Sequence, residues 1–494
     1  MRHSSRLMLI STSLLLLSLS SCSSGTRRPA EESAPGGSSP AAAHVIDLKS
    51  FPGTVGQVTY NNNTVRMDTE SAGKSLLSVS QDGSVFIFDP SDERVRNLAP
   101  GKVMLLENVA LRKITEVVSQ NGHVVVGTEP AALTDAIQDG VIKWNVPIHL
   151  GSKTAQVFPA EAGGESLEHA AKAWFGPMPV VYADIAGLQI SGEKDGWHYS
   201  LAAQPGADRL NIAISLSKGV KGLQVELQGK GYVQSFDNET SIEIHESQLK
   251  MFDFKNKNLK GEMNVEWSAV REGDAPALKG EDSMFKFPAN FSAPMPIAGI
   301  PFVLEISESV LFQPAFGEKK ELGKGSFKVS YNGEQGFGLN QGTPVAEGQM
   351  EGESEIGDLT SVSIAPSGLI LGVVAPKVEL KLGAESAFQM LQKGMPLPKI
   401  ADEAIDALSG TKLGKYAKEK IKSEASAYYA FTSMFQYVTS GPMALVSCKR
   451  SSVTLYGIAG AKATFLGHAL GDKKVDLYKK EFKRVVPPVK ACDF

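Results

Sequence analysis

The alternation of aliphatic and polar residues with a period of two is the feature that most constrains the fold of this chain. Residues 210–216 run Leu-Asn-Ile-Ala-Ile-Ser-Leu, and residues 223–227 run Leu-Gln-Val-Glu-Leu. Because successive side chains of a β-strand point to opposite faces, the pattern predicts strands with one aliphatic and one polar face. The same alternation recurs at residues 85–88, 242–244, 263–267, 302–306 and 327–331.

Short polar pairs that contain glycine separate these predicted strands. They are Asp82-Gly83, Asn121-Gly122, Asp195-Gly196 and Asn332-Gly333. Such pairs adopt positive φ angles at little cost, so they favour tight hairpin turns between antiparallel strands. The predicted fold is therefore mainly β, with antiparallel sheets in a sandwich- or barrel-like arrangement.

Three segments have features typical of helices, which makes the expected class α+β overall. Residues 130–138 place Pro130 at a first helical position and are followed by Gly140, and residues 166–174 predict a second short helix. Near the C-terminus, apolar residues recur at spacings of three and four and predict an amphipathic helix of about 25 residues. They are Leu413, Ala417, Ile421, Ala425, Tyr428, Phe431, Phe435 and Val438. This helix is expected to cover one face or end of the β body; the alternative is that it shields a channel for a hydrophobic ligand.

A proline-rich apolar stretch at residues 287–302 interrupts the predicted strands. Its four prolines cannot donate backbone hydrogen bonds and argue against a central strand there. Two interpretations remain for so apolar a loop. It is either packed under the sheet or exposed as a contact patch for lipid or a partner.

The N-terminus has the features of an export signal. Arg2 and Arg6 precede an apolar run at residues 7–19, which is shorter than the ~20 residues that a transmembrane helix needs. The run ends at Leu19-Ser20-Ser21-Cys22, which resembles the lipobox of bacterial lipoproteins. The resemblance implies that residues 1–21 are removed and that the thiol of Cys22 is acylated. The alternative is an ordinary signal peptide in which Cys22 is incidental.

The segment after Cys22 is suited to link a lipid to a folded body. Residues 23–43 contain almost no bulky apolar side chain, so they cannot bury enough surface to fold and predict a flexible tether. The lipoprotein resemblance places the protein at a bacterial cell envelope. Ser23, rather than an aspartate, at the position after the lipidated cysteine favours the outer membrane.

The remaining cysteines, Cys448 and Cys492, predict a disulfide, because the lipoprotein resemblance implies export to an oxidising compartment. Two reduced thiols are the alternative. A redox role is not expected, since no Cys-x-x-Cys occurs.

Composition and pattern predict five consecutive regions. They are a signal peptide at 1–21, a tether at 22–44, a β-rich module with a short helix at 45–153, a large antiparallel β domain at 154–385, and a helical and β segment closed by the disulfide at 386–494.

No local motif identifies a reaction, a cofactor or a metal site. His245-Glu246 lacks the second histidine of a zinc-binding helix, and the chain has neither a Gly-x-Ser-x-Gly elbow nor a Gly-x-Gly-x-x-Gly loop that opens a helix. The mildly acidic, mixed composition, with a formal charge of −4, argues against a nucleic-acid partner, because phosphate neutralisation requires concentrated Lys and Arg. No catalytic, cofactor-binding or metal-binding residue is therefore predicted.

Three hypotheses for function follow. The favoured one is a lipid-anchored, non-catalytic binding or structural module that contacts the membrane through its anchor and an envelope protein as partner. The second is a carrier of lipid or another hydrophobic ligand. The third is a hydrolase of envelope polymers, which requires a cleft where a histidine and one or two carboxylates converge.

Overall fold

The computed structural model describes most of the chain from residue 45 onward. The segments outside the description are 1–44, 48–53, 81–82, 151–156, 160–180, 183–187, 275–282, 288, 316–319, 342, 359, 363–367, 383–425, 441–447, 463–472 and 493–494. The predicted signal peptide, Cys22, the tether and the helix predicted at 166–174 all lie outside the described residues.

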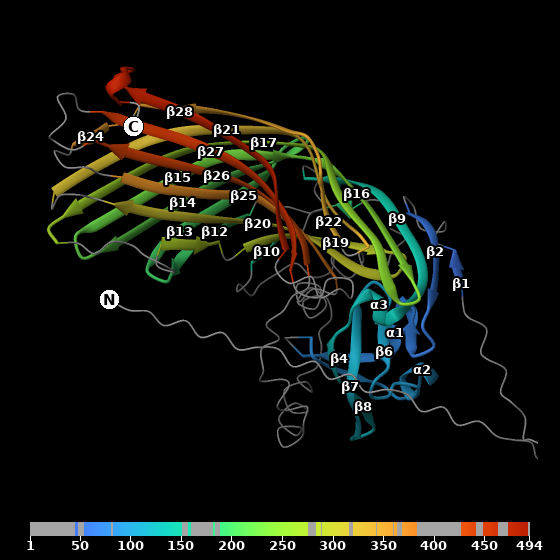
Figure 1. Cartoon of the computed structure of the whole chain (residues 1–494). Coiled ribbons are helices and arrows are strands. Elements are labelled where there is room, and N and C mark those ends of the chain that lie inside the picture. Colours follow the sequence, from blue (N-terminus) through green and yellow to red (C-terminus); the bar gives the residue numbers. More distant parts are fainter. Residues whose placement is uncertain are drawn as a thin grey trace, which may run out of the picture. The chain divides into compact units, whose positions relative to one another are not determined.

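The largest sheet contains fourteen described strands in the order β1-β2-β9-β16-β17-β15-β14-β13-β12 (Figure 1). In addition, β11 pairs with β9, β21 pairs with β17, and β22, β23 and β24 pair with β21. Its strands are β1 (Val45–Asp47), β2 (Thr54–Tyr60), β9 (Ile137–His149), β11 (Val181–Tyr182), β12 (Leu188–Lys194), β13 (Trp197–Pro205), β14 (Arg209–Val220), β15 (Leu223–Gln234), β16 (Phe236–His245), β17 (Gln248–Glu272), β21 (Lys320–Asn340), β22 (Thr343–Glu347), β23 (Met350–Ile356) and β24 (Thr360–Val362). The 25-residue strand β17 organises this sheet, because it pairs with β16, β15 and β21.

The second sheet contains eight described strands in the order β10-β19-β20-β25-β26-β27-β28, with β18 beside β20. They are β10 (Val157–Pro159), β18 (Met284–Lys286), β19 (Ala289–Ile297), β20 (Ile300–Ala315), β25 (Gly368–Leu382), β26 (Ser426–Thr439), β27 (Lys449–Lys462) and β28 (Lys473–Val486). All of its pairings are antiparallel.

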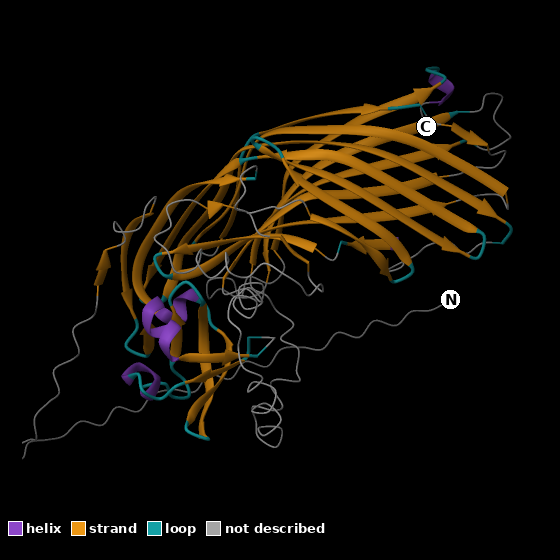
Figure 2. Cartoon of the chain, turned by 180° about the vertical axis from the view of Figure 1, so that it is seen from behind, coloured by secondary structure: helices purple, strands orange, loops and turns teal. Residues whose placement is uncertain are grey.

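A six-stranded sheet in the order β3-β6-β7-β8-β5-β4 forms the remainder of the fold. It consists of β3 (Thr64–Met67), β4 (Leu76–Val79), β5 (Val85–Phe88), β6 (Val103–Leu106), β7 (Ala110–Gln120) and β8 (His123–Pro130), beside helices α1 (Thr69–Ser75), α2 (Glu93–Arg96) and α3 (Leu133–Ala136) (Figure 2). A 3-10 helix, η4 (Lys490–Cys492), follows β28. Of the helices that the structure describes, none has the length and apolar character that a bilayer crossing requires.

The two large sheets pack face to face through aromatic rings on their inner faces. The ring of Phe435 in β26 lies 5.7 Å from that of Trp267 and 5.1 Å from that of Phe327, measured between centroids. Tyr331 and Phe431 lie 4.4 Å apart. All five side chains are buried, so rings fill the space between the sheets at these contacts.

Polar contacts join β28 to β23 where these two sheets meet, at a place called here the β23–β28 seam. The Nζ of Lys480 donates to the carbonyl oxygen of Gly352 at 3.0 Å. Arg484 donates to the carbonyl oxygen of Ile356 at 2.7 Å and to a carboxylate oxygen of Asp358 at 2.6 Å. The side chain of Arg484 is 39% exposed, so the seam is held by long, partly solvated side chains.

The prediction of a mainly β, antiparallel fold is confirmed. The predicted strands at 210–216 and 223–227 lie in β14 and β15, and their aliphatic side chains are buried. The Asn121-Gly122 and Asp195-Gly196 turns have positive φ angles and connect β7 to β8 and β12 to β13.

The prediction of a C-terminal amphipathic helix is wrong for the residues that the structure describes. Residues 426–439 form strand β26, whereas residues 413–425 lie outside the description. The aromatic residues of this segment also recur with a period of two: Tyr429, Phe431, Phe435 and Tyr437 are buried on one face. Long-range pairing with β25 and β27 on either side satisfies the backbone of β26, so the strand forms despite the helical spacing.

The proline-rich stretch contains a strand, which contradicts the sequence-based expectation. Residues 289–297 form β19 and return as β20 through a turn at Ala298-Gly299. The pairing of β19 with β10 ends at Phe291, and Pro294 and Pro296 lie beyond that point. Among the described residues, Pro294 and Pro296 therefore pair only with β20. Met295 and Ile297 are buried, as the packed alternative predicted.

Two further expectations need correction. Asn332-Gly333 is not a turn but lies within β21, where Gly333 has a φ of 155° and a Cβ would lie 2.2 Å from the carbonyl oxygen of Gln349. Only glycine permits this close approach of two backbones. The helix expected at 130–138 is limited to α3, because Pro130 belongs to the end of β8.

Candidate functional site

The two C-terminal cysteines are joined as predicted. Cys448 and Cys492 form a disulfide with a Cα–Cα distance of 5.3 Å, and both side chains are buried. Ser440 holds the first cysteine through two hydrogen bonds of 2.9 Å, and the amide of Cys492 donates to the carbonyl oxygen of Val489 at 2.9 Å. The bond therefore fixes the chain after β28 to the start of β27.

A hollow of about 630 Å³ lies over the polar faces of β2, β9, β16 and the start of β17. It is called the outer hollow. Its lining combines a few aliphatic side chains with several polar and ionisable ones. The lining side chains used below are those of Val55, Val141, Asp139, Glu243, His245 and Lys250.

Backbone geometry makes room for this hollow. Gly56 has a φ of 143°, and a Cβ there would lie 1.7 Å from the carbonyl oxygen of Val141. Beside it, Val55 and Val141 are 59% and 38% exposed, which is unusual for valines on long strands. The outer hollow therefore has an apolar part that the fold leaves open to solvent.

A histidine and a carboxylate are paired within the outer hollow. The Nδ1 of His245 lies 2.6 Å from the Oδ1 of Asp139, and the amide of Glu246 donates to the same oxygen at 3.0 Å. Since a carboxylate accepts, Nδ1 carries the proton in this pair and Nε2 is the acceptor of the neutral ring. The hydrogen bond from the amide of Glu246 lowers the pKa of the Asp139 carboxyl below its usual range, and His245 lowers it further to a smaller extent.

The turn from β16 to β17 positions His245. Glu246 and Ser247 both have positive φ angles, 53° and 57°, a conformation that favours glycine. The amide of Ser247 donates to the carbonyl oxygen of Gln138 at 2.7 Å, and its hydroxyl contacts Asn61 at 3.1 Å. These contacts offset the unfavourable turn conformation and fix the histidine against β9.

This pair can act as a general base, because Asp139 orients the ring and leaves Nε2 to accept a proton. Among the described residues, no serine, threonine or cysteine hydroxyl or thiol is hydrogen-bonded to His245, so a water molecule is the nucleophile that the pair could activate. From the sequence, His245 belongs to an incomplete zinc motif and otherwise resembles a surface or structural histidine. Asp139 lies 106 positions away, and only the pairing of β9 with β16 brings the two together.

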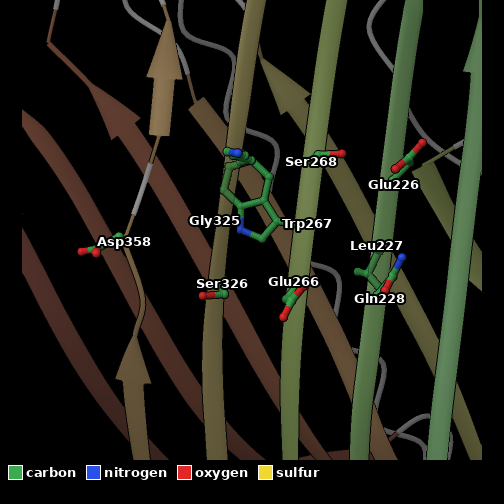
Figure 3. A pocket seen from close by; sticks show the side chains of 10 residues that line it. Glu226, Leu227, Gln228, Glu266, Trp267, Ser268, Gly325, Ser326 and Asp358 are labelled. Carbon is green, nitrogen blue, oxygen red and sulfur yellow. The ribbon is translucent and has the colours of Figure 1, made fainter.

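A second, more polar hollow of about 340 Å³ lies over β15, β17 and β21. Figure 3 shows Glu226, Glu266 and Ser326 around it, with the indole of Trp267 beside Gly325. The carboxylate of Asp358, which also lines this hollow, is paired with Arg484 of the seam. In the part of the chain that the structure describes, no three acidic, histidine or cysteine side chains form a group that could hold a metal ion.

Several ionisable side chains are buried within the sheets, and Glu308 is one of them. Glu308 of β20 is 6% exposed, and neither carboxylate oxygen has a hydrogen-bond partner among the described residues. Burial raises the pKa of Glu308 to about 8. The pKa of the Tyr331 phenol is also raised well above its usual value, mainly by burial and to a smaller extent by the nearby Glu308. The acid is therefore protonated at neutral pH, which avoids a buried charge.

Comparison with known proteins gives two partial matches. Residues 50–139 are similar to a domain of unknown function (DUF8403), and residues 194–390 are similar to another domain of unknown function (DUF8402). No curated protein and no solved structure matches the chain significantly. Asp139 lies in the first matched segment and His245 in the second, so the outer hollow is built from both.

Proposed function

We propose that this chain is a lipid-anchored protein of a bacterial cell envelope, held at the outer membrane, whose body is a non-catalytic binding or structural module. The Cys448–Cys492 disulfide is the observation that carries the proposal. Disulfides persist in oxidising compartments such as the bacterial periplasm and are rare in the cytosol. A structural disulfide therefore supports export, which the N-terminal sequence also predicts.

The anchor in this proposal is Cys22. Acylation of its thiol, with a further chain on the new amino terminus, would give the two or more chains that stable membrane attachment requires. Residues 23–43 would then separate the lipid from β1 as a flexible tether.

Intact mass analysis of the protein from its native host tests the anchor. The expected mass corresponds to a chain that begins at residue 22 and carries acyl groups. An unmodified Cys22, or a chain that retains residues 1–21, would contradict the proposal. Treatment of the same sample with a reductant should add the two hydrogens of the open disulfide and leave the acyl mass unchanged.

The packing of the two large sheets favours a scaffold over a carrier. A carrier of lipid needs an apolar space, and at the contacts of Trp267, Phe327, Tyr331, Phe431 and Phe435 that space holds protein side chains. Native mass spectrometry of the body without its anchor distinguishes the two. A scaffold gives the mass of the protein alone, whereas lipid that co-purifies in repeated preparations would establish the carrier.

The outer hollow favours one second candidate, a hydrolase of envelope polymers. A histidine and a carboxylate, His245 and Asp139, are paired there, and Glu243 also lines the hollow. The test compares release of soluble fragments from purified peptidoglycan by the natural protein, by His245→Asn and by His198→Asn. His198 is a matched control, because it lies beside Glu193 at 3.8 Å and outside the hollow. Loss of release only in His245→Asn would establish the hydrolase, and no release by the natural protein would reject it.

A further inference from the structure

The last strand of the eight-stranded sheet carries a local charge opposite to that of the whole protein. Residues 473–490 contain seven lysine or arginine residues and two acidic residues, whereas the complete chain has a formal charge of −4. The strand β28 lies at the end of its sheet's strand order, beside β27. The positive charge is thus concentrated along one edge of a sheet.

Strand register places part of this charge on a single face. Lys479 pairs with Tyr456 and Lys483 pairs with Ser452, two residues of β27 on the same side as Arg450. Lys479 is exposed, with its Nζ 5.6 Å from the centroid of the Tyr456 ring. The side chain of Lys483 is 47% exposed and its Nζ lies 3.2 Å from a carboxylate oxygen of Glu481, so Arg450, Lys479 and Lys483 give this face a positive excess that Glu481 only partly offsets. These side chains differ from Lys480 and Arg484, which alternate with them and serve the β23–β28 seam.

Exposed aliphatic residues lie at the end of this sheet where Arg450 and Lys483 are found, whereas Lys479 lies at the middle of β28 and Val486 is on the opposite face from Lys483. Val438 pairs with Arg450 across β26 and β27 and is 45% exposed. Val486 and Val489, at the end of β28 and just after it, are each 43% exposed. The Cys448–Cys492 disulfide holds this tail beside the start of β27. We call these residues, together with Arg450, Lys479 and Lys483, the basic corner.

The combination of charges and aliphatic groups identifies the partner chemistry. Lysine on an edge strand also prevents pairing with another sheet, but that role does not require exposed valines. A polysaccharide or nucleic acid would use the charges and leave the valines in water. A bilayer that contains anionic lipids uses both, because its headgroups attract the cations and its interface accepts aliphatic side chains.

We propose that the basic corner docks on an anionic lipid bilayer surface. This docking proposal depends on the proposed function in one respect: an envelope location is needed for a membrane to be within reach. Binding at this corner would add a second contact to the proposed lipid anchor and would fix how the body lies on the membrane, which a flexible tether alone cannot do. In this proposal the disulfide keeps the segment after β28 in place at the docking surface.

Vesicle co-sedimentation of the full mature chain with Cys22→Ser tests the docking without any acyl group. Binding is expected to phosphatidylcholine vesicles that contain phosphatidylglycerol, and it should weaken when salt is raised. The triple variant Arg450→Gln/Lys479→Gln/Lys483→Gln should lose roughly 100-fold in partition coefficient, since each basic residue near such a surface contributes about one factor of five. The control Lys194→Gln/Lys230→Gln/Lys260→Gln removes the same charge from exposed positions on other strands and should bind like the parent.

A second variant tests the aliphatic part. Val438→Ser/Val489→Ser should weaken vesicle binding at high salt, where charge attraction is screened, while circular dichroism shows that the fold is retained. Equal binding by the charge variant and its control would overturn the proposal, as would binding to a soluble polyanion but not to vesicles. The anchor is assayed separately by the mass of residue 22, so failure of one test leaves the other intact.

Discussion

The interior between the two large sheets and the β23–β28 seam join the same pair of sheets by different means. In the interior, buried rings such as Trp267 and Phe435 pack against one another. At the seam, Lys480 and Arg484 reach across to carbonyl oxygens while they remain partly solvated. The difference teaches that apolar burial sets the stability of this fold, whereas partly exposed charges mainly set the relative position of the edges.

The largest effect expected is a pH dependence that originates in the interior. Glu308 has a pKa of about 8 when folded and 4.5 in its unperturbed state. Between these values the folded protein keeps a proton that the unfolded chain has released, so the free energy of unfolding falls as pH rises. The expected decrease is roughly 1.4 kcal/mol per pH unit, or about 5 kcal/mol in total.

Urea denaturation at several pH values, on the natural protein and on Glu308→Gln, measures this contribution. The variant lacks the titrating proton, so the difference in unfolding free energy between the two proteins should change with pH. Parallel pH profiles would show that Glu308 is hydrated or paired, and would remove the contrast between a dry interior and a solvated seam.

Removal of an interior ring should cause the second-largest loss in the free energy of unfolding. Phe435→Ala deletes a ring that contacts both Trp267 and Phe327, and the expected loss of stability is about 4 kcal/mol. Gln436→Ala is the matched control, because its side chain is exposed on the opposite face of the same strand. Equal losses for the two variants would mean that the rings do not dominate the packing.

The disulfide should contribute less to the free energy of unfolding than the interior ring of Phe435 does. Its loop spans 44 residues, and Cys448→Ser/Cys492→Ser should lower the free energy of unfolding by about 3 kcal/mol, which is typical of native disulfides. A reductant should lower the stability of the natural protein toward that of the variant and leave the variant unchanged. A reductant effect on the variant would point to a cause other than this bond.

The smallest effect is expected at the seam. Arg484→Ala should cost about 1 kcal/mol, because its hydrogen bonds are charge-assisted but partly exposed. Lys483→Ala, on the other face of the same strand, should cost less. Thermal unfolding at low and high salt measures both, and salt should reduce the effect of Arg484→Ala. A loss as large as that of Phe435→Ala would abolish the distinction between interior and seam.

Local sequence patterns were sufficient to predict a mainly β, antiparallel fold. The period-two alternation at 210–216 and 223–227 and the Asn121-Gly122 turn identified strands and a hairpin, since these patterns are local. The sequence also predicted the Cys448–Cys492 disulfide, because two cysteines remain besides Cys22 and the expected compartment is oxidising. These features depend on neighbouring residues or on composition, so no knowledge of the remaining chain was needed.

Only the tertiary structure decided the features that depend on long-range pairing. Strand β26 has a spacing that also suits a helix, and its neighbours β25 and β27 select the strand. Asp139 and His245 come together because β9 pairs with β16, and Val438 lies on the same face as Arg450 because β26 pairs with β27. Strand register is set by hydrogen bonds between residues far apart in the chain, and no local pattern specifies which strands meet.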